Sequence, residues 1–403
     1  MPPQSQPPTA APAARALHAF IMWLLHVQRR FDPFFRPAFD ATLRHPTAWL
    51  IQLLINAGRR DEHMKLAEEK PEPDEDAYLD SIISSMGAYM NAHYTPGTYE
   101  RAGNTKTHGI VRADFVVRDD VPAELKYGIF AQPLTYRAWV RFSGPGPDSP
   151  ADIDDVGFVS CSIKTMGVPG PKLFDDEKHT QDFLMICTPT FVTPDTKANA
   201  QLQIQILKGT PFFYFANFTR PHLLDGFMQS LWNKTQNNPL QATYYSTVPY
   251  LLGEGRAMQY SARPRSSKQD RVPKLPFRPP NDYLRQAMVA TLAGEDIEFD
   301  FMVQAQTDAH RMPIENAAVK WPERVSPFVP VATLRIPKQT FDSPAQRRFA
   351  SSLSYNPWHC IAEHRPLGNQ SRARLRLYST LARLRQDKNA TPHVEPAGHE
   401  VFP

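Results

Sequence analysis

Residues 372–385 read RARLRLYSTLARLR, a short and strongly basic stretch with one tyrosine near its middle. On a helix, residues four, seven and eleven positions apart share a face, so one stripe would carry Arg374, Tyr378, Leu381 and Arg385. Like charges on one helix face repel each other and add little stability. The stretch therefore predicts either a solvated basic helix or a helix whose cationic face binds an anionic partner.

The composition narrows the class of protein. The chain has 403 residues, 41% of them hydrophobic, which is enough for a sizeable core. The balance of 45 basic and 41 acidic residues is too even to indicate a nucleic-acid-binding surface, and we expect no nucleic acid partner. The three cysteines, Cys161, Cys187 and Cys360, have neither disulfide-framework nor metal-site spacing. This usage favours an intracellular, reducing compartment, the cytoplasm first.

Residues 1–70 are expected to form a tail and an apolar helical arm. The opening MPPQSQPPTAAPAA is rich in proline and alanine and is predicted to be disordered. Two apolar runs follow, ALHAFIMWLLHV at 16–27 and TAWLIQLLINAG at 47–58, and both are too short to span a bilayer. Residues 16–57 are interpreted first as amphipathic helices docked on the protein's own surface. The alternative is an arm that contacts a membrane surface or a second copy of the chain.

Residues 71–386 are expected to form one α+β domain, followed by a C-terminal tail at 387–403. Beyond an acidic linker at 68–78, a period of two in hydrophobicity predicts strands at 109–117, 135–143, 156–165, 183–187 and 297–306. Strands that follow one another without helices indicate an antiparallel barrel or sandwich. Helical patterns lie at 196–207, 223–232, 282–294, 344–353 and 372–386.

The strand TYRAWVRFS, residues 135–143, has one apolar face and one that carries Arg137, Trp139, Arg141 and Ser143. If that second face is buried, its guanidiniums need an anionic partner, because an unpaired buried charge is very costly. A ligand with a metal centre and carboxylates would satisfy Arg141 together with Arg101, Arg374 and Arg385. A tyrosinate can be the axial ligand of haem iron, and a guanidinium one turn away favours the ionised phenol. Arginine also suits the propionates, which accept paired hydrogen bonds.

These residues resemble motifs of the catalase superfamily, over roughly residues 80–386. The family's proximal pattern, R-x-x-x-Y with arginines five and seven positions later, is matched by Arg374, Tyr378, Arg383 and Arg385. Its distal R-x-x-H-x-K is similar to residues 101–106, its R-F-S to residues 141–143, and its N-T-P to residues 187–189. The segments YYSTVPYLLGEGRAMQY and SYNPWHCIAEHRPLGNQSRARLRLY look like those of the smaller catalase-like haem proteins.

The resemblance implies a catalase-like antiparallel β-barrel with surrounding helices that binds haem, b type first. Tyr378 would then be the axial ligand and Arg374 its charge partner. The propionates would be held by Arg101, Arg141 and Arg385. The pocket would be lined by Ser143 and Phe191. Catalase relatives also self-associate, so a homo-oligomer is expected from resemblance.

Two positions depart from the family pattern. Asn104 stands where the family has its distal histidine, and Cys187 stands where it has its distal asparagine. An asparagine amide can bind peroxide but cannot carry its proton, so fast hydrogen peroxide disproportionation is not expected. His108 is a candidate substitute base, although a structural role is favoured for it. For Cys187, core packing is favoured over a distal thiol.

Two functional hypotheses follow from different classes. The first is a haem-dependent, peroxidase-like or catalase-like oxidoreductase that acts on an organic or lipid hydroperoxide, or on a small metabolite. The second is a non-catalytic haem-binding protein for sensing or storage. A barrel without haem is a third reading, and the intact proximal residues speak against it.

Overall fold

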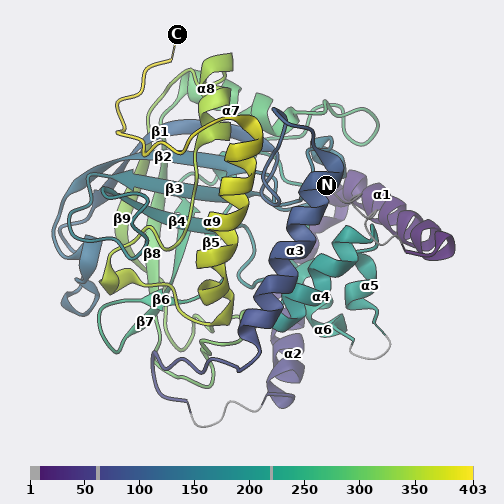
Figure 1. Cartoon of the computed structure of the whole chain (residues 1–403), viewed down its shortest axis with the longest axis horizontal. Coiled ribbons are helices and arrows are strands. Elements are labelled where there is room, and N and C mark those ends of the chain that lie inside the picture. The colour runs from purple at the N-terminus through teal and green to yellow at the C-terminus, as the bar shows by residue number, and fades with distance from the viewer. Residues whose placement is uncertain (1–9, 60–63, 218–220, 403) are drawn as a thin grey trace.

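The computed structural model describes residues 10–59, 64–217 and 221–402. Its centre is an antiparallel sheet with the strand order β5-β4-β3-β2-β1-β9-β8-β7-β6, and an additional pairing of β5 with β7 closes it into a barrel of eight strands (Figure 1). The strands are β1 Thr107–Val117, β2 Thr135–Ser143, β3 Ser160–Met166, β4 Thr180–Ile186, β5 Tyr244–Tyr245, β6 Tyr250–Leu251, β7 Ala257–Pro264, β8 Ile297–Ala305 and β9 Val329–Ile336. The predicted antiparallel, α+β class is confirmed.

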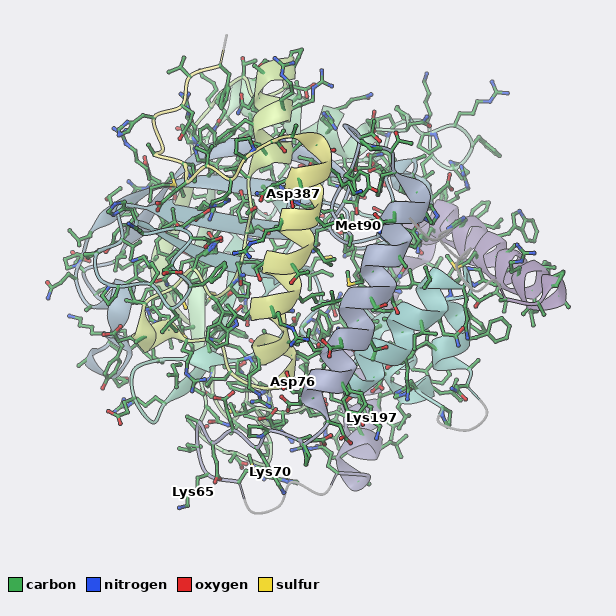
Figure 2. The ribbon with its side chains drawn as sticks, viewed as in Figure 1. Lys65, Lys70, Asp76, Met90, Lys197 and Asp387 are labelled. Atoms are coloured by element: carbon green, nitrogen blue, oxygen red, sulfur yellow. The ribbon has the colours of Figure 1, made fainter. Side chains whose placement is uncertain are left out.

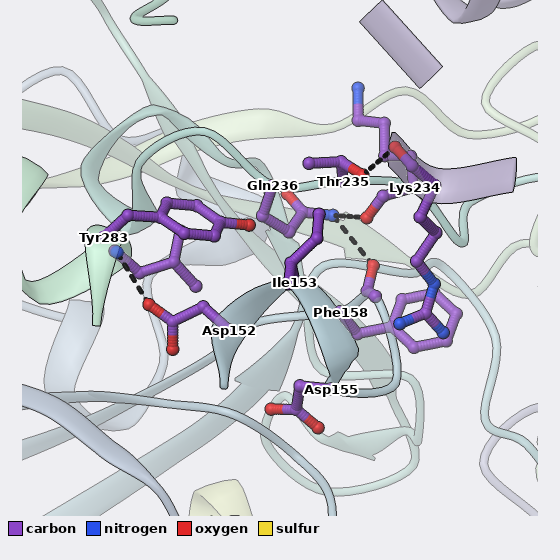
Figure 3. A pocket seen from close by; sticks show the side chains of 11 residues that line it. Asp152, Ile153, Asp155, Phe158, Lys234, Thr235, Gln236 and Tyr283 are labelled. Atoms are coloured by element: carbon purple, nitrogen blue, oxygen red, sulfur yellow. Dashed lines mark hydrogen bonds between the residues drawn. The ribbon is translucent and has the colours of Figure 1, made fainter. Parts of the chain in front are cut away.

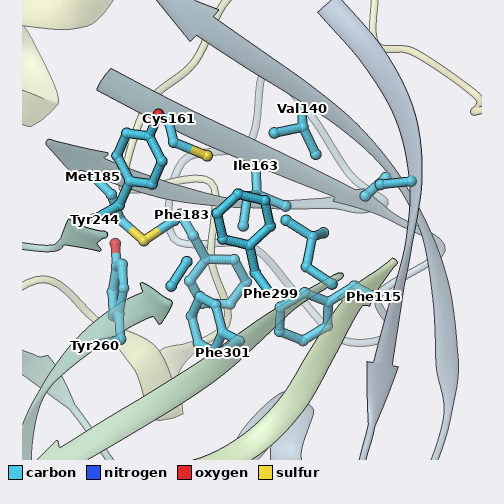
Figure 4. Packing of buried hydrophobic residues seen from close by; sticks show 14 of the residues in the cluster. Phe115, Val140, Cys161, Ile163, Phe183, Met185, Tyr244, Tyr260, Phe299 and Phe301 are labelled. Atoms are coloured by element: carbon cyan, nitrogen blue, oxygen red, sulfur yellow. The ribbon is translucent and has the colours of Figure 1, made fainter. Parts of the chain in front are cut away.

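Aromatic side chains fill the barrel interior (Figure 4). The rings of Phe115 and Phe183 pack against the ring of Phe301, each with a centroid–centroid distance of 5.0 Å. The ring of Tyr260 packs against Phe301 with a centroid–centroid distance of 5.3 Å. These distances are typical of favourable aromatic pairs. The alternate residues of β2, including Val140, belong to this interior cluster, so Arg141 and Ser143 project from the opposite face of the strand.

Helices cover the barrel and extend from it (Figure 1). They are α1 Pro12–Thr42, α2 Arg44–Ala57, α3 Glu75–His93, α4 Thr196–Leu207, α5 Phe212–Phe215, α6 Leu223–Ser230, α7 Tyr283–Gly294, α8 Pro344–Ser352 and α9 Asn369–Asn389. Helix α9 contains the basic stretch and runs beside α3 (Figure 2). The two helices share an apolar cluster that includes Met90, Leu377 and Leu381. One face of α9 is therefore held by packing, which fixes where its arginines lie.

Several boundaries differ from the sequence-based expectation. Residues 12–14 begin α1 and are not disordered, while residues 1–9 of the predicted disordered tail lie outside the described residues. The acidic linker ends early, because α3 starts at Glu75 with acidic residues in its first turn, where the helix dipole favours them. Helix α9 continues to Asn389, so the predicted boundary between 386 and 387 falls inside it. All three cysteines are free and buried.

Candidate functional site

Two of the predicted site arginines converge on the segment that follows α8. Arg101 Nη2 donates to the backbone carbonyls of Ala350 at 2.9 Å and Leu353 at 2.5 Å. Arg385, near the C-terminal end of α9, donates to the same Leu353 carbonyl at 3.1 Å. Residues nearly three hundred positions apart in the chain thus share one carbonyl acceptor. Their guanidiniums are brought together by the fold.

Arg141 joins this group from the outward face of β2. Its Nη2 donates to the carbonyls of Asn104 at 2.6 Å and Thr105 at 3.1 Å, and to the Thr107 hydroxyl at 2.7 Å. The side chain is 2% exposed, so these bonds are made away from water. Arg141 therefore fixes the segment that carries Arg101 and Asn104 against the barrel.

The three guanidiniums form a cationic cluster, defined here as Arg101, Arg141 and Arg385. In the part of the chain that the structure describes, no carboxylate forms a hydrogen bond or ion pair with any of them. Burial lowers the pKa of Arg101 to about 10. Burial also lowers the pKa of Arg141 and Arg385, and the charge of Arg101 adds to the effect on both. Three buried like charges without a counter-ion are costly, so the cluster is suited to an anion.

Arg374 and Tyr378 lie toward the other end of α9. Arg374 is buried and its guanidinium lies 5.2 Å from the ring centroid of Phe191, a cation–π distance. Tyr378 is half-buried, one turn further along the helix, and packs beside the α3–α9 cluster. Among the described residues, Arg374 also has no carboxylate partner. The residues of the predicted stripe therefore all lie on helix α9, and Arg374 of this stripe contacts Phe191.

Two tyrosines that the sequence analysis did not single out lie at this site. Burial raises the pKa of Tyr355, and the charges of Arg141 and Arg101 oppose that rise. Burial raises the pKa of Tyr250 to about 12, and the charges of Arg374 and Tyr378 both act on it. Neither hydroxyl has a hydrogen-bond partner within the described residues, although both oxygens are buried. Both tyrosines lie in the segments quoted for the family resemblance, which was the available signal.

The end of β2 gathers the predicted distal residues Asn104, His108 and Ser143. The backbone N–H of Asn104 donates to the Pro145 carbonyl at 3.1 Å, just beyond Ser143. Ser143 is fully buried, and its hydroxyl is unpartnered among the described residues. His108 lies against Gly144, where an added Cβ would be 3.7 Å from the histidine Nε2. The three residues therefore lie near the same end of β2.

His108 is buried, and neither ring nitrogen has a hydrogen-bond partner in the described part of the chain. Its Nδ1 lies 3.7 Å from a carboxylate oxygen of Asp152, which is ion-paired with Lys106 at 2.8 Å. Burial, followed by the positive charge of Lys106, lowers the pKa of His108 to about 3. The imidazole is thus neutral and a weak base at physiological pH, which favours a structural role.

Cys187 lies apart from the other predicted site residues. It follows β4, belongs to the interior cluster of the barrel, and its Sγ accepts a hydrogen bond from the Val159 N–H at 3.2 Å. Burial raises the pKa of its thiol to about 11, so the thiolate is scarce. These facts favour the packing role over a distal thiol.

A second buried charge cluster contains three potential metal-ligating residues. Glu177, Asp182 and His359 could each offer one ligand atom, and these atoms lie within 4.8 Å of one another. Lys164, however, lies between the two carboxylates, with its Nζ 2.8 Å from an Asp182 oxygen and in contact with Glu177. The ammonium group occupies the position of a cation, so this cluster is an ion-pair network.

The sequence matches no family model and no curated protein. Solved structures do match. The crystal structure of a fungal catalase is similar over 86% of this chain and 70% of its own, with a TM-score of 0.56 and 17% identity. Catalase A from Saccharomyces cerevisiae matches over 86% of this chain and 72% of its own, with a TM-score of 0.58 and 15% identity. The structure of a bacterial catalase matches over 84% of this chain and 67% of its own, with a TM-score of 0.55 and 16% identity.

The chain has a catalase-like fold. The predicted fold class, a catalase-like antiparallel barrel with surrounding helices and an N-terminal arm, is confirmed by this similarity and by the closed barrel. At such low identity the similarity concerns the fold, and the roles of individual side chains must be argued from this chain's own geometry.

Proposed function

We propose that this catalase-like protein binds haem through Tyr378 and the surrounding arginines, and that it is an oxidoreductase for an organic or lipid hydroperoxide or a small metabolite. Haem, when bound, supplies the iron chemistry that cleaves or rearranges peroxides. The observation that carries the proposal is the set of four buried or half-buried guanidiniums that have no carboxylate partner among the described residues.

The donor set fits haem. Two propionates would neutralise part of the charge of Arg101, Arg141 and Arg385, and guanidinium–carboxylate hydrogen bonds are among the strongest in proteins. The phenol of Tyr378 would supply the oxygen ligand of the iron, and Arg374 lies one turn away on the same helix. The hydroxyls of Tyr355 and Ser143, which are buried and unpartnered within the described residues, are the kind of polar atoms that a bound group or water satisfies.

The distal residues limit the reaction. Asn104 can donate or accept a hydrogen bond from a hydroperoxide but cannot accept its proton, and His108 is a weak base for the reason given above. General acid–base help is typically worth about 10²–10⁴-fold in rate, so a fast catalase is not expected. We therefore propose an organic or lipid hydroperoxide as the substrate class, since fast hydrogen peroxide disproportionation needs the proton acceptor that Asn104 does not provide.

The same distal residues also favour a second function, non-catalytic haem binding for storage or sensing. Both functions need haem, so the proximal residues do not distinguish them. Turnover distinguishes them: an oxidoreductase consumes cumene hydroperoxide or oxidises an added organic co-substrate, whereas a binder keeps a stable spectrum.

The first experiment is an absorption spectrum of the purified, haem-supplemented protein, before and after addition of hydroperoxide. We expect a Soret band with a tyrosinate-type charge-transfer band, and loss of haem retention in Tyr378→Phe. Tyr78→Phe is the matched control, because Tyr78 packs in the same α3–α9 cluster and should keep haem. Unchanged haem content in Tyr378→Phe would refute the ligand assignment. The absence of a Soret band in the parent protein would refute haem binding.

A further inference from the structure

The N-terminal arm, defined here as α1 and α2, exposes a long apolar face. In α1 the exposed large residues recur at helical spacing, with Phe20, Trp23, Phe31 and Phe34 on one stripe. Phe34 is 75% exposed and Trp23 is 57% exposed, values that are unusual for aromatic side chains of this size. The full set of exposed large apolar residues in the arm is Leu17, Phe20, Trp23, Leu24, Leu25, Phe31, Phe34, Phe35, Leu43, Trp49, Leu50, Leu53 and Leu54.

Three charged residues of α1, Arg29, Asp32 and Arg36, are buried against the body of the protein. Asp32 is buried and accepts a hydrogen bond from the Thr235 N–H at 2.6 Å, while the Thr235 hydroxyl donates to the Arg29 carbonyl at 2.7 Å. Arg29 itself lines a small pocket with Asp155 and Lys234 (Figure 3). The polar contacts of α1 thus orient the helix, and they leave its apolar stripe pointing to solvent.

The same arrangement continues toward α2. Arg36 is paired with Asp40 at 3.0 Å, and Asp40 is also paired with Arg44 and Lys234 at 3.0 and 3.2 Å. Asp32 and Asp40 are the only carboxylates in residues 12–57, and neither is exposed. The outward surface of the arm therefore carries no exposed carboxylate, while Arg15 is exposed at the start of α1.

Helix α6, which packs against α2, also exposes apolar side chains. The core between them includes Ala48, Ile51 and Met228. On its solvent side, α6 exposes Phe227 at 57% and Leu223. Exposed large apolar residues are thus concentrated on three neighbouring helices, and such concentrations mark interaction sites.

We propose that this face docks on a phospholipid membrane surface. Phenylalanine, tryptophan and leucine on one side of a helix, with carboxylates excluded and arginine at the flank, are the composition of a helix that lies in the headgroup region. No helix in the described ranges is long and apolar enough to cross a bilayer, so the contact is peripheral. A neutral or anionic headgroup layer meets no opposing negative charge on this face. The inference does not depend on haem binding.

The test is flotation of the full-length protein with vesicles of phosphatidylcholine alone and of phosphatidylcholine with phosphatidylglycerol. We expect the parent protein to float, and the double variant Trp23→Ser/Phe34→Ser to lose at least about tenfold in bound fraction, because two interfacial aromatic anchors are removed. The matched control is Leu134→Ser/Val394→Ser, which removes two exposed apolar residues outside the arm. Circular dichroism checks that each variant is folded.

Two outcomes would overturn the proposal. One is a parent protein that stays with the lipid-free fraction at both vesicle compositions. The other is a parent dimer by light scattering that the Trp23→Ser/Phe34→Ser substitution converts to a monomer without any change in flotation. In that case the apolar face of the arm is an interface with a second copy of the chain.

Discussion

Asn104 adopts a backbone conformation that suits only a few residue types. Its φ of 52° lies in the left-handed region, where asparagine, aspartate and histidine are enriched among residues other than glycine. Its carbonyl accepts a hydrogen bond from Arg141, and this backbone contact does not depend on the side chain at position 104. A histidine can therefore replace Asn104 without new strain in the backbone.

We expect Asn104→His to raise hydrogen peroxide consumption by the haem-loaded protein, by up to about 10²-fold, since it supplies a proton acceptor at the distal position. Oxygen evolution under saturating hydrogen peroxide measures the change. Asn104→Gln is the control, because it keeps an amide and should give no gain. If Asn104→His gives no gain while haem content is unchanged, the assignment of Asn104 to the distal position is wrong.

His108 makes the stability of the protein depend on pH. Burial lowers its pKa from 6.5 to about 3, so between these values the unfolded chain binds a proton that the folded chain does not. Stability therefore falls as pH decreases below 6.5, by up to about 1.4 kcal/mol per pH unit from this group. We expect His108→Gln to flatten this part of the profile, measured by urea unfolding from pH 7 to pH 4.5. His179→Gln, at an exposed position, should leave the profile unchanged, and an equal slope in His108→Gln would contradict the assignment.

At the scale of elements, α9 has two functions that separate along its length. Leu377 and Leu381 pack on α3, whereas Arg385 enters the cationic cluster with one hydrogen bond to the Leu353 carbonyl. Because that bond is partly offset by repulsion from Arg101, the side chain adds little to the haem-free fold. We therefore expect the Arg385 side chain to contribute mainly to the binding of an anion.

Arg385→Met should weaken haem binding by about 10–100-fold, the value of one charge-assisted hydrogen bond, without lowering the stability of the haem-free protein. Titration of the Soret band gives the dissociation constant, and thermal unfolding gives the stability. Arg383→Met on the same helix is the control, because Arg383 is exposed. Equal haem affinity in Arg385→Met and Arg383→Met would remove Arg385 from the site.

The elements that the sequence predicted are those with a clear period. Strand β2 and helix α4 were predicted with their observed bounds, because their apolar and polar residues recur with a clear period. Strand β7 was missed, although its apolar Met258, Tyr260 and Ala262 alternate with polar residues. Helix α3 was not predicted, and its first residues were assigned to the linker because its acidic first turn continues a proline-rich acidic run.

At the scale of the whole molecule, the candidate site was predictable only as a set of residue types. The spacing of Arg374, Tyr378 and Arg385 on one stripe follows from helix geometry. Arg385 meets Arg101 at the carbonyl of Leu353, the residue after α8, and Arg141 is held nearby by the Asn104 carbonyl. No local pattern encodes that meeting, since it joins residues from opposite ends of the barrel domain. The grouping of these residues was predicted only from the resemblance to catalases. Tyr355 and Tyr250 lie in segments that belong to the same resemblance, but neither was singled out as a site residue.

The two proposals make a joint prediction about the whole molecule. If the arm docks on lipid and the haem site accepts organic hydroperoxides, a substrate dissolved in vesicles is consumed faster by a docked protein, because docking raises its local concentration. We expect haem-loaded Trp23→Ser/Phe34→Ser to lose about tenfold in turnover of a vesicle-borne fatty-acid hydroperoxide, and to keep its turnover of water-soluble tert-butyl hydroperoxide. A ferrous–xylenol orange assay of the remaining hydroperoxide measures both rates. Equal losses on both substrates would show that the arm affects the haem site itself. No loss on either substrate would show that membrane docking does not affect turnover.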